Sequence, residues 1–298
     1  MEFAHTTVLL QESIANLNCR PDKIYVDCTL GGGGHSEAIL KAAGPSARLI
    51  AIDQDKDALE ATSRRLEPFK EQITFVHSNF SRLDEVLRDL KIDKVAGLMF
   101  DLGVSSYQLD NPERGFSYMQ DAPLDMRMNA EADLTAGDLL QQLSEQELAK
   151  IIWEYGEERW SKRIAGFIVE ARKKKRLETT GDLVEVIKAA IPAGARRNGP
   201  HPAKRTFQAL RIAVNNELGI IRDSLLKGIN CLEPGGRICV ISFHSLEDRL
   251  VKHTLREQKQ EKTVQVLTKK PILPSDEEVD SNPRARSAKL RAAEKMVF

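Results

Sequence analysis

The sequence predicts a doubly wound α/β core that is interrupted by an all-helical insert. Through the first hundred residues, short and nearly continuous hydrophobic runs alternate with helical segments, which is typical of a parallel sheet covered on both faces. From residue 111 to residue 202, helical periodicity takes over and strand-like runs are absent. After residue 203 the α/β pattern returns. With 298 residues and 41% hydrophobic content, the chain can bury one large core or two smaller ones.

The first part of the core is expected to contain four strands and two crossover helices. The strands are the apolar runs 24–26, 48–53, 73–80 and 94–101. The first helix covers about 36–43 and stops at Gly44-Pro45, a helix-ending pair. The second helix covers about 56–66 and stops near Pro68. A doubly wound sheet built from such units binds its ligands at the carboxyl ends of the strands.

Three apolar stripes predict the helices of the insert, because each places its residues at the spacing of one helix face. The stripes are 148, 151, 152 and 155; 160, 164, 167, 168 and 171; and 183, 186, 187, 190 and 191. The first stripe follows 144-SEQE-147, a capping box that marks a helix start. Trp153 and Trp160 fall among these stripes, and we expect both to be core residues.

The α/β pattern resumes behind a long helix that is expected from about residue 203 to residue 229. The elements that follow the turn 233-EPGG-236 are a strand at 237–243, a helix near 246–258, and two strand candidates at 262–268 and 286–294. An acidic, proline-containing loop separates the last two. The expected division is therefore core 1–110, helical insert 111–202 and core 203–298.

Charge and cysteine content exclude several classes of protein. Lys plus Arg equals Asp plus Glu, 44 against 44, so any nucleic-acid contact must come from local patches and not from a global field. The four cysteines form no C-x-x-C pair and lack the His spacing of a zinc site, so we expect reduced thiols and no metal site. Apolar runs long enough for a bilayer and the pattern of a signal peptide are both absent. These features predict a cytoplasmic protein with no membrane partner, and they leave the oligomeric state open.

A run of four glycines in 26-VDCTLGGGGHSEAIL-40 marks the turn between the first strand and the first helix. Glycine is costly inside regular structure, so the run indicates a backbone that approaches a ligand closely at a helix N-terminus. Asp53 ends the second strand 20 residues after Gly33, where an acid can accept hydrogen bonds from ribose hydroxyls. The pattern therefore predicts a nucleotide-containing ligand.

Two features favour S-adenosylmethionine over a dinucleotide. The G-x-G-x-x-G fingerprint, started at Gly31, places Ser36 where its third glycine belongs. Asp27 precedes the turn, and its carboxylate suits a ligand with an amino group and a sulfonium but repels a pyrophosphate. The alternative is that the glycines form only a tight turn and that Asp27 caps the helix.

The sequence resembles the bacterial 16S rRNA cytosine-N4 methyltransferases, the RsmH or MraW family, nearly from end to end. The motifs that carry the resemblance are 5-HTTVLL-10, 33-GGHS-36, 52-ID-53, 100-FDLGVSS-106, 108-QLD-110, 113-ERGFS-117, 123-PLDMRM-128, 155-YGEER-159, 201-HPAKRTFQALRI-212, 242-SFHSLEDR-249 and 282-NPRARS-287. So many motifs in one order are more specific than any glycine loop alone. The resemblance implies a Rossmann-like, S-adenosylmethionine-dependent methyltransferase core around the helical insert.

Transferred position by position, the resemblance implies cofactor contacts at Gly33, Gly34, His35, Asp53, Phe80, Asp101 and Gln108. Phe80 is expected to end the third strand, where its ring can stack on adenine. Asp101 is expected to end the fourth strand, close to the transferable methyl group. His35 either contacts the ligand or only caps backbone, and Gln108 rests on the resemblance alone.

The resemblance also implies the substrate, which is the N4 amine of a P-site cytosine in the decoding centre of 16S rRNA, position 1402 in the standard numbering. Such a buried target requires the 30S subunit or a late precursor as partner. The amine is a poor nucleophile because its lone pair is delocalised, so the site must supply hydrogen-bond acceptors and a proton acceptor. We expect Asp101 to be the acceptor, with Ser105 and Ser106 as further catalytic lining beside Tyr107. The alternative is that Asp101 only orders its loop.

Two basic segments are candidates for RNA contacts. The cluster 172-RKKKR-176 ends the second helix of the insert, and 196-RRNGPHPAKR-205 lies close to Phe207. Such clusters bind phosphates in a salt-dependent manner, although a charge run can equally be a solvated helix end. His244 either faces the pocket or is structural. Two other functions stay open: a nicotinamide oxidoreductase, which Asp27 and the missing third glycine disfavour, and a non-catalytic assembly factor with the same fold.

Overall fold

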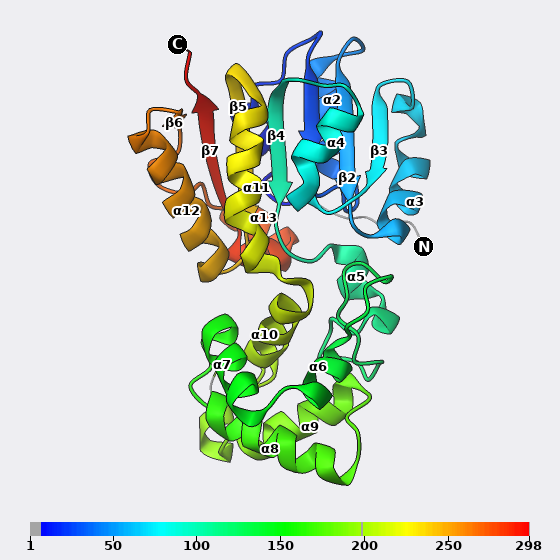
Figure 1. Cartoon of the computed structure of the whole chain (residues 1–298), viewed down its shortest axis with the longest axis vertical. Coiled ribbons are helices and arrows are strands. Elements are labelled where there is room, and N and C mark those ends of the chain that lie inside the picture. The colour runs from blue at the N-terminus through cyan, green and yellow to red at the C-terminus, as the bar shows by residue number, and fades with distance from the viewer. Residues whose placement is uncertain (1–6, 198, 298) are drawn as a thin grey trace. The chain divides into compact units, whose positions relative to one another are not determined.

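A seven-stranded mixed sheet forms the core of the computed structural model, which describes residues 7–197 and 199–297 (Figure 1). The strands are β1 (Ile24–Asp27), β2 (Arg48–Asp53), β3 (Ile73–His77), β4 (Val95–Asp101), β5 (Leu232–Ser242), β6 (Val264–Val266) and β7 (Lys289–Lys295). Within the described residues their order is β3-β2-β1-β4-β5-β7-β6, with β1 to β5 parallel and β7 antiparallel to both neighbours. The strand order reverses at β1, because β2 and β3 lie on one side of it whereas β4 and β5 lie on the other. The point between β1 and β4 is the topological switch point, where such folds bind ligands.

Helices cover both faces of this sheet because its central strands are apolar on both sides. One face packs on α4 (Leu83–Asp89), α11 (Glu217–Cys231) and α12 (Ser245–Gln260). The other packs on α1 (Leu10–Leu17), α2 (Gly34–Ala43) and α3 (Lys56–Arg65). Successive residues of a strand point to opposite faces of the sheet. In β4, for example, Leu98 and Phe100 belong to the first core, and Met99 between them belongs to the second. Shorter elements of this unit are η1 (Glu67–Phe69), η2 (Phe80–Arg82), α13 (Asp276–Ser281) and η5 (Pro283–Ser287).

A second compact unit is helical and has its own apolar core. Its elements are α5 (Ser106–Asp110), η3 (Pro112–Arg114), α6 (Ala136–Gln142), α7 (Glu145–Gly156), α8 (Ser161–Lys174), α9 (Thr180–Ala190), η4 (Ala193–Arg196) and α10 (Lys204–Asn215). Reciprocal capping boxes begin four of the helices, at Ser105, Thr135, Ser144 and Thr179. The expected doubly wound core with a helical insert is therefore confirmed.

The boundaries of the insert differ from the expected ones. The helical unit comprises 104–217, and the sheet unit comprises the rest of the described chain, whereas the sequence pattern suggested 111–202. The difference arises at both ends, because α5 and α10 pack within the helical core although neither has a composition distinct from its surroundings. Phe207 and Leu210 of α10 belong to that core, and both are 3% exposed or less.

Three expected elements are corrected by local backbone geometry. The long helix 203–229 is two helices, because Asn216 adopts the left-handed conformation (φ 48°, ψ 37°), which ends α10. The third strand ends at His77 and not at 80, because the Asn79 side chain caps η2. The strand expected at 237–243 begins at Leu232, beyond an irregularity opposite Val95 and Gly97.

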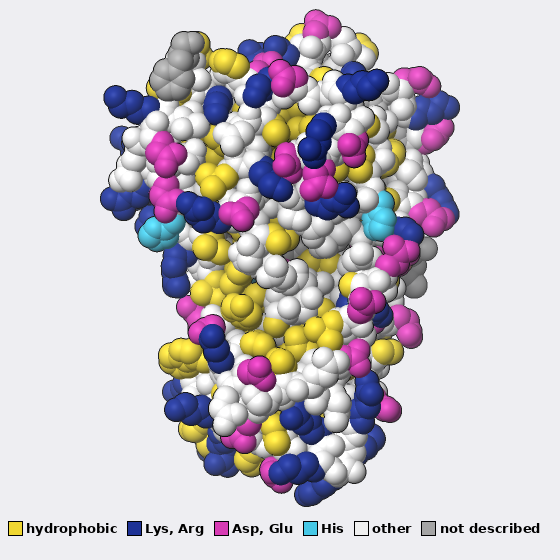
Figure 2. All heavy atoms as spheres, viewed as in Figure 1, with side chains coloured by type: hydrophobic (Ala, Val, Ile, Leu, Met, Phe, Trp, Pro, Cys, Tyr) yellow, Lys and Arg dark blue, Asp and Glu magenta, His cyan; other side chains and the backbone are white. Residues whose placement is uncertain are grey.

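Charged side chains of both signs are interspersed over the visible face of the sheet unit (Figure 2), in keeping with the neutral composition. The four cysteines are free, with Cys28 and Cys239 buried. Among the described residues, no helix has the length and hydropathy that crossing a membrane requires. Within the same residues, His, Cys, Asp and Glu side chains form no group that could hold a metal ion.

Candidate active site

Three carboxyl groups lie at the carboxyl ends of three neighbouring parallel strands. Asp53 ends β2, Asp27 ends β1 and Asp101 ends β4. Asp27 is paired in register with Ala51 of β2 and Met99 of β4, so the three carboxyl groups follow one edge of the sheet. This edge contains the switch point between β1 and β4, and it therefore is the candidate site.

Asp27 orders the start of the glycine loop. Its Oδ2 accepts a hydrogen bond from the Ser36 hydroxyl at 2.7 Å, and its Oδ1 accepts one from the Thr29 N–H at 3.1 Å. The residue is 1% exposed. Both carboxylate oxygens of Asp27 therefore accept hydrogen bonds from the glycine loop and helix α2. Its buried negative charge is what it can offer to a ligand beside the loop.

The glycines are required by packing inside the protein. A Cβ at Gly33 would collide with the Thr62 side chain, and the residue also has a left-handed φ of 75°. A Cβ at Gly34 would collide with the side chain of Thr7. The space beside both glycines is thus filled by the chain, which favours the tight-turn interpretation at these two positions. Residues 5 and 6 of the motif 5-HTTVLL-10 lie outside the described residues.

We predict that Gly33→Val and Gly34→Val lose cofactor binding together with thermal stability, because each new side chain meets packed atoms. Calorimetry with S-adenosylhomocysteine and thermal unfolding measure the two effects. The matched control is Gly34→Ala in a Thr7→Gly background, which removes the colliding side chain and should restore much of the lost stability. A Gly34→Ala variant that is as stable as the wild type but does not bind the cofactor would show that the space beside Gly34 is needed by the ligand.

Asp53 holds the glycine loop and the next loop at once. Its Oδ2 accepts the Gly31 N–H at 2.8 Å, and its Oδ1 accepts the Asp55 N–H at 2.9 Å. The Thr62 hydroxyl in turn donates to the Gly31 carbonyl oxygen at 2.6 Å. Asp53 is half-buried, and each of its carboxylate oxygens keeps a lone pair that these two backbone hydrogen bonds do not use.

Asp101 carries an unpartnered oxygen at the switch point. Its Oδ1 is buried and has no hydrogen-bond partner, and its Oδ2 lies 3.7 Å from Nδ1 of His35. Its backbone N–H donates to the Thr29 hydroxyl at 2.6 Å, which ties β4 to the turn after β1. His35 is 5% exposed, and its Nε2 lies 3.2 Å from the Val8 carbonyl oxygen. The structure thus brings His35 and Asp101 together.

Burial raises the pKa of all three carboxyl groups of the site. For Asp101 burial raises the pKa to about 8, and the carboxyl groups of Asp27 and Glu247 add to this rise. Burial likewise raises the pKa of Asp27 to about 6 and that of Asp53 to about 6, although hydrogen bonds to both oppose the rise. A buried cluster of like charges disfavours ionisation in this way until a cation compensates it.

Phe80 does not end a strand, as the sequence had suggested, but begins η2. Its ring contacts Phe100 edge to face, with the ring centroids 5.7 Å apart and the planes at 84°. The side chain is half-buried. The ring is only partly covered by its contact with the core, so its expected stacking on adenine stays a prediction that this position allows.

Ser105, Ser106 and Gln108 belong to the helical unit, where they form the start of α5. The Ser105 hydroxyl accepts the Gln108 N–H at 3.2 Å, and the Gln108 side-chain oxygen accepts the Ser105 N–H at 3.0 Å. This reciprocal capping box is a structural use of both side chains. Their roles toward cofactor and substrate stay predictions.

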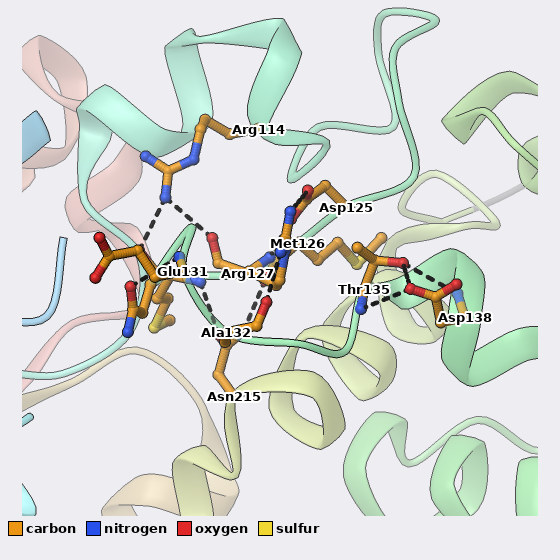
Figure 3. Close-up of polar contacts among 11 residues, drawn as sticks. Arg114, Asp125, Met126, Arg127, Glu131, Ala132, Thr135, Asp138 and Asn215 are labelled. Atoms are coloured by element: carbon orange, nitrogen blue, oxygen red, sulfur yellow. Dashed lines mark hydrogen bonds and ion pairs between the residues drawn. The ribbon is translucent and has the colours of Figure 1, made fainter. Parts of the chain in front are cut away.

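Two of the sequence motifs build a hydrogen-bonded loop inside the helical unit (Figure 3). Arg114 donates to the carbonyl oxygens of Arg127 and Met128 at 3.0 and 2.9 Å. Asn215 of α10 donates to the Met126 carbonyl oxygen and accepts the Met128 N–H. These contacts hold Met126 in a left-handed conformation (φ 63°), which is uncommon for a non-glycine residue. The motifs 113-ERGFS-117 and 123-PLDMRM-128 therefore have a structural function.

The basic cluster 172–176 is largely paired within its own unit. Arg172 donates to the carbonyl oxygens of Leu140 and Leu143 at the end of α6. The ion pairs of the cluster are Lys173 with Glu170, Lys175 with Asp182 and Arg176 with Asp138. Local partners thus compensate much of its charge, which lowers its value as a phosphate-binding surface.

This pairing changes the expected result of neutralising the cluster. We predict that Arg172→Gln alone destabilises the helical unit by about 1.5 kcal/mol, because it removes charge-assisted hydrogen bonds to a helix end. Replacing Lys173, Lys174 and Lys175 with glutamine should leave stability nearly unchanged. Filter-binding titrations over a range of salt concentrations should show little change in slope for this triple variant. A slope that falls by about 0.7 to 0.9 per lysine would establish direct phosphate contacts instead.

Other sequence expectations have mixed outcomes. Trp153 is 59% exposed and not a core residue, while Trp160 is half-buried. Phe207 belongs to the helical core and contacts Tyr118, with ring centroids 5.6 Å apart. His244 caps α12 in a reciprocal box with Glu247, which is a structural use of its side chain. Residue 198 of the second basic segment lies outside the described residues.

Sequence reasoning missed Thr29 and Glu247. Thr29 connects Asp27 to Asp101, and a polar residue two positions after an aspartate is a recognisable turn signal. Glu247 is 1% exposed and accepts the N–H groups of Phe243 and His244. The charge of Glu247 helps to raise the pKa of Asp101. The two residues are far apart in the sequence, so this interaction could not be predicted from their spacing.

The comparison with family models matches residues 2–296 to the MraW methylase family. The chain belongs to this family. Two relatives called ribosomal RNA small subunit methyltransferase H, from Clostridioides difficile and Brevibacillus brevis, are each 52% identical. Both alignments cover 99% of this chain and at least 99% of the relative. The resemblance to the MraW family expected from the motifs is thus confirmed.

A solved structure supports the fold of this MraW family member. The crystal structure of a protein from Clostridium thermocellum aligns with a TM-score of 0.51 at 13% identity. The alignment covers 99% of this chain and 100% of that one. The sheet order and the helical insert therefore form a Rossmann-like methyltransferase fold.

Proposed function

We propose that this methylase transfers a methyl group from S-adenosylmethionine to the N4 amine of a decoding-centre cytosine in 16S rRNA, in the cytoplasm. The names of the 52% identical relatives support small-subunit rRNA as the substrate. The partner is the 30S subunit or a late precursor. Membership of a methylase family disfavours the nicotinamide oxidoreductase alternative.

The observation that carries the proposal is the set of three carboxyl groups at neighbouring strand ends. S-adenosylmethionine supplies a transferable methyl group on a positively charged sulfur, and it also carries an ammonium group. Buried Asp27 and the unpartnered Oδ1 of Asp101 provide the negative charge that such a cation requires. Asp53 provides a half-buried acceptor for ribose hydroxyls. The residues present therefore fit this cofactor.

Asp101 is proposed to act on the cytosine amine. In its ionised form, the free Oδ1 can accept an N–H of the amine, hold its lone pair toward the methyl group and receive the released proton. His35 beside the other oxygen orients the carboxyl group. Ser105 and Ser106 stay candidates for the lining, with Gln108 as a cofactor contact from the same helix.

Proton release provides a sharp test of the cofactor. A bound sulfonium should lower the raised pKa values of Asp101, Asp27 and Asp53, so binding at pH 7 should release protons. S-adenosylhomocysteine lacks the sulfonium charge and should release fewer. Calorimetry in two buffers of different ionisation enthalpy measures both numbers, and Asp101→Asn should remove most of the difference. Equal proton release by the two ligands would contradict the proposed geometry.

The reaction itself is tested by incubating the protein with labelled S-adenosylmethionine. The substrates are 30S subunits that lack the modification and, in parallel, naked 16S rRNA. Mass spectrometry of the digested RNA should locate the label on the N4 amine of one cytosine in the assembled subunit. Cofactor binding without transfer to either substrate would favour a non-catalytic assembly factor.

A further inference from the structure

An exposed tryptophan lies in a hollow of the helical unit that the proposed function does not use. The hollow encloses about 670 Å³ and is lined by residues of α7, the following turn and the start of α8: Glu145, Gln146, Ala149, Lys150, Trp153, Arg159, Ser161 and Lys162. Trp153 is 59% exposed, while its neighbour Ile152 is fully buried in the core. The ring therefore adds nothing to the core of the unit and is available to a ligand.

The charges around this ring are unbalanced. Among the residues that the structure describes, three cations of the hollow have no ion-pair partner: Lys150, Arg159 and Lys162. By contrast, Lys173 and Lys175 of the cluster 172–176 are paired with carboxylates. The carboxylate among the lining residues is Glu145, eight residues before Trp153 and about 12 Å away along the helix axis. Three cations and one carboxylate line the hollow, which is therefore positively charged in a chain whose formal net charge is zero.

The arrangement of Arg159 supports a planar ligand. Its guanidinium carbon lies 5.4 Å from the centroid of the Trp160 ring, which is a cation–π contact. Stacking holds the guanidinium plane in place without neutralising its charge. Arg159 thus remains available to a phosphate beside the exposed ring of Trp153.

We propose that this hollow binds one unpaired nucleotide of single-stranded RNA, with its base stacked on Trp153 and its phosphates held by Lys150, Arg159 and Lys162. Aromatic platforms flanked by cations bind single strands in this way, because every base has a π-face and every linkage carries a charge. A protein partner fits less well, since lysines are depleted where protein interfaces exclude water. The inference rests on the proposed function, because it takes rRNA as the substrate.

Tryptophan fluorescence tests the stacking in the full-length chain. The chain has two tryptophans, so the Trp160→Phe variant reports on Trp153 alone. Titration with a single-stranded decamer of cytidylate should quench its emission. In the otherwise unchanged chain, Trp153→Ala should weaken binding about 10-fold or more, and Trp153→Phe, which keeps a ring, should stay within about 3-fold of the wild type.

The cations are tested by the salt dependence of the same binding. Lys150→Gln and Lys162→Gln should each lower the log–log slope by about 0.7, the value per contact for single strands. The matched control is Lys173→Gln, whose lysine is paired with Glu170 and should leave the slope unchanged. Absence of quenching, or an affinity that Trp153→Ala leaves unchanged, overturns the proposal and assigns the hollow to another occupant.

These results separate the two proposals. Oligonucleotide binding that depends on Trp153, without methyl transfer to rRNA, would support the hollow and refute the proposed function. Normal methyl transfer with binding that ignores Trp153 would do the reverse. Calorimetry with S-adenosylhomocysteine should give the same affinity for Trp153→Ala as for the wild type, which shows that the variant is folded.

Discussion

Replacing Asp101 with asparagine should lower the rate of methyl transfer at saturating RNA by at least about 100-fold. The amide keeps the shape of the side chain but cannot receive the proton of the amine. The free Oδ1 at the end of β4 is the acceptor that the variant weakens. Labelled methyl transfer to 30S subunits under single-turnover conditions measures the change, with Asp223→Asn, an exposed aspartate of the same unit, as control.

The pH profile gives this prediction a signature that loss of structure cannot imitate. Burial raises the pKa of Asp101 in the free enzyme to about 8, so kcat/KM of the wild type for S-adenosylmethionine should rise with pH until about 8 and then level off. The variant should lack this limb. A variant that retains both rate and profile would show that Asp101 only orders its loop.

The same substitution should increase stability. Burial favours the neutral form of Asp101, so the folded protein retains a proton that the unfolded chain loses above its ordinary value of 3.8. The wild type therefore loses stability as the pH rises from about 4 to about 8, and asparagine avoids this loss. Thermal unfolding at pH 5 and at pH 8 should show the larger gain for the variant at pH 8.

Replacing Asp53 with alanine should weaken the binding of S-adenosylhomocysteine by about one to two decades in Kd. The loss of charge-assisted hydrogen bonds to ribose hydroxyls accounts for about 1.5–3 kcal/mol. The substitution also frees the N–H groups of Gly31 and Asp55, so part of the effect is loosening of the glycine loop. Calorimetry measures the constant.

Asp53→Asn separates these two contributions, because its amide oxygen can still accept the Gly31 N–H. We expect an intermediate affinity for this control. Since the pKa of Asp53 is about 6, binding to the wild type should also weaken as the pH falls through 6, and alanine should abolish that dependence. An unchanged Kd in the alanine variant would remove Asp53 from the site.

The sequence by itself determined the apolar strands of the sheet and placed an acid at the end of β1, β2 and β4. Continuous apolar runs predict buried parallel strands in whichever sheet forms, because both faces are covered by helices. An acid directly after such a run lies at the ligand edge of the sheet by topology alone. Asp27, Asp53 and Asp101 could therefore be placed before any coordinates.

Only the tertiary structure decided what those residues contact. The spacing of the sequence does not relate Glu247 to Asp101, or Thr62 and Thr7 to the glycines whose Cβ positions they exclude. Trp153 was expected in the core, but it lies about 100° around α7 from the buried Ile152 and is exposed. The charges of 172–176 pair with partners up to 38 residues away in the chain. Bringing such distant residues together costs loop-closure entropy, so these pairs form only when the helices pack. Periodicity reports which face of an element is buried, whereas contacts between distant elements exist only after folding has brought them together.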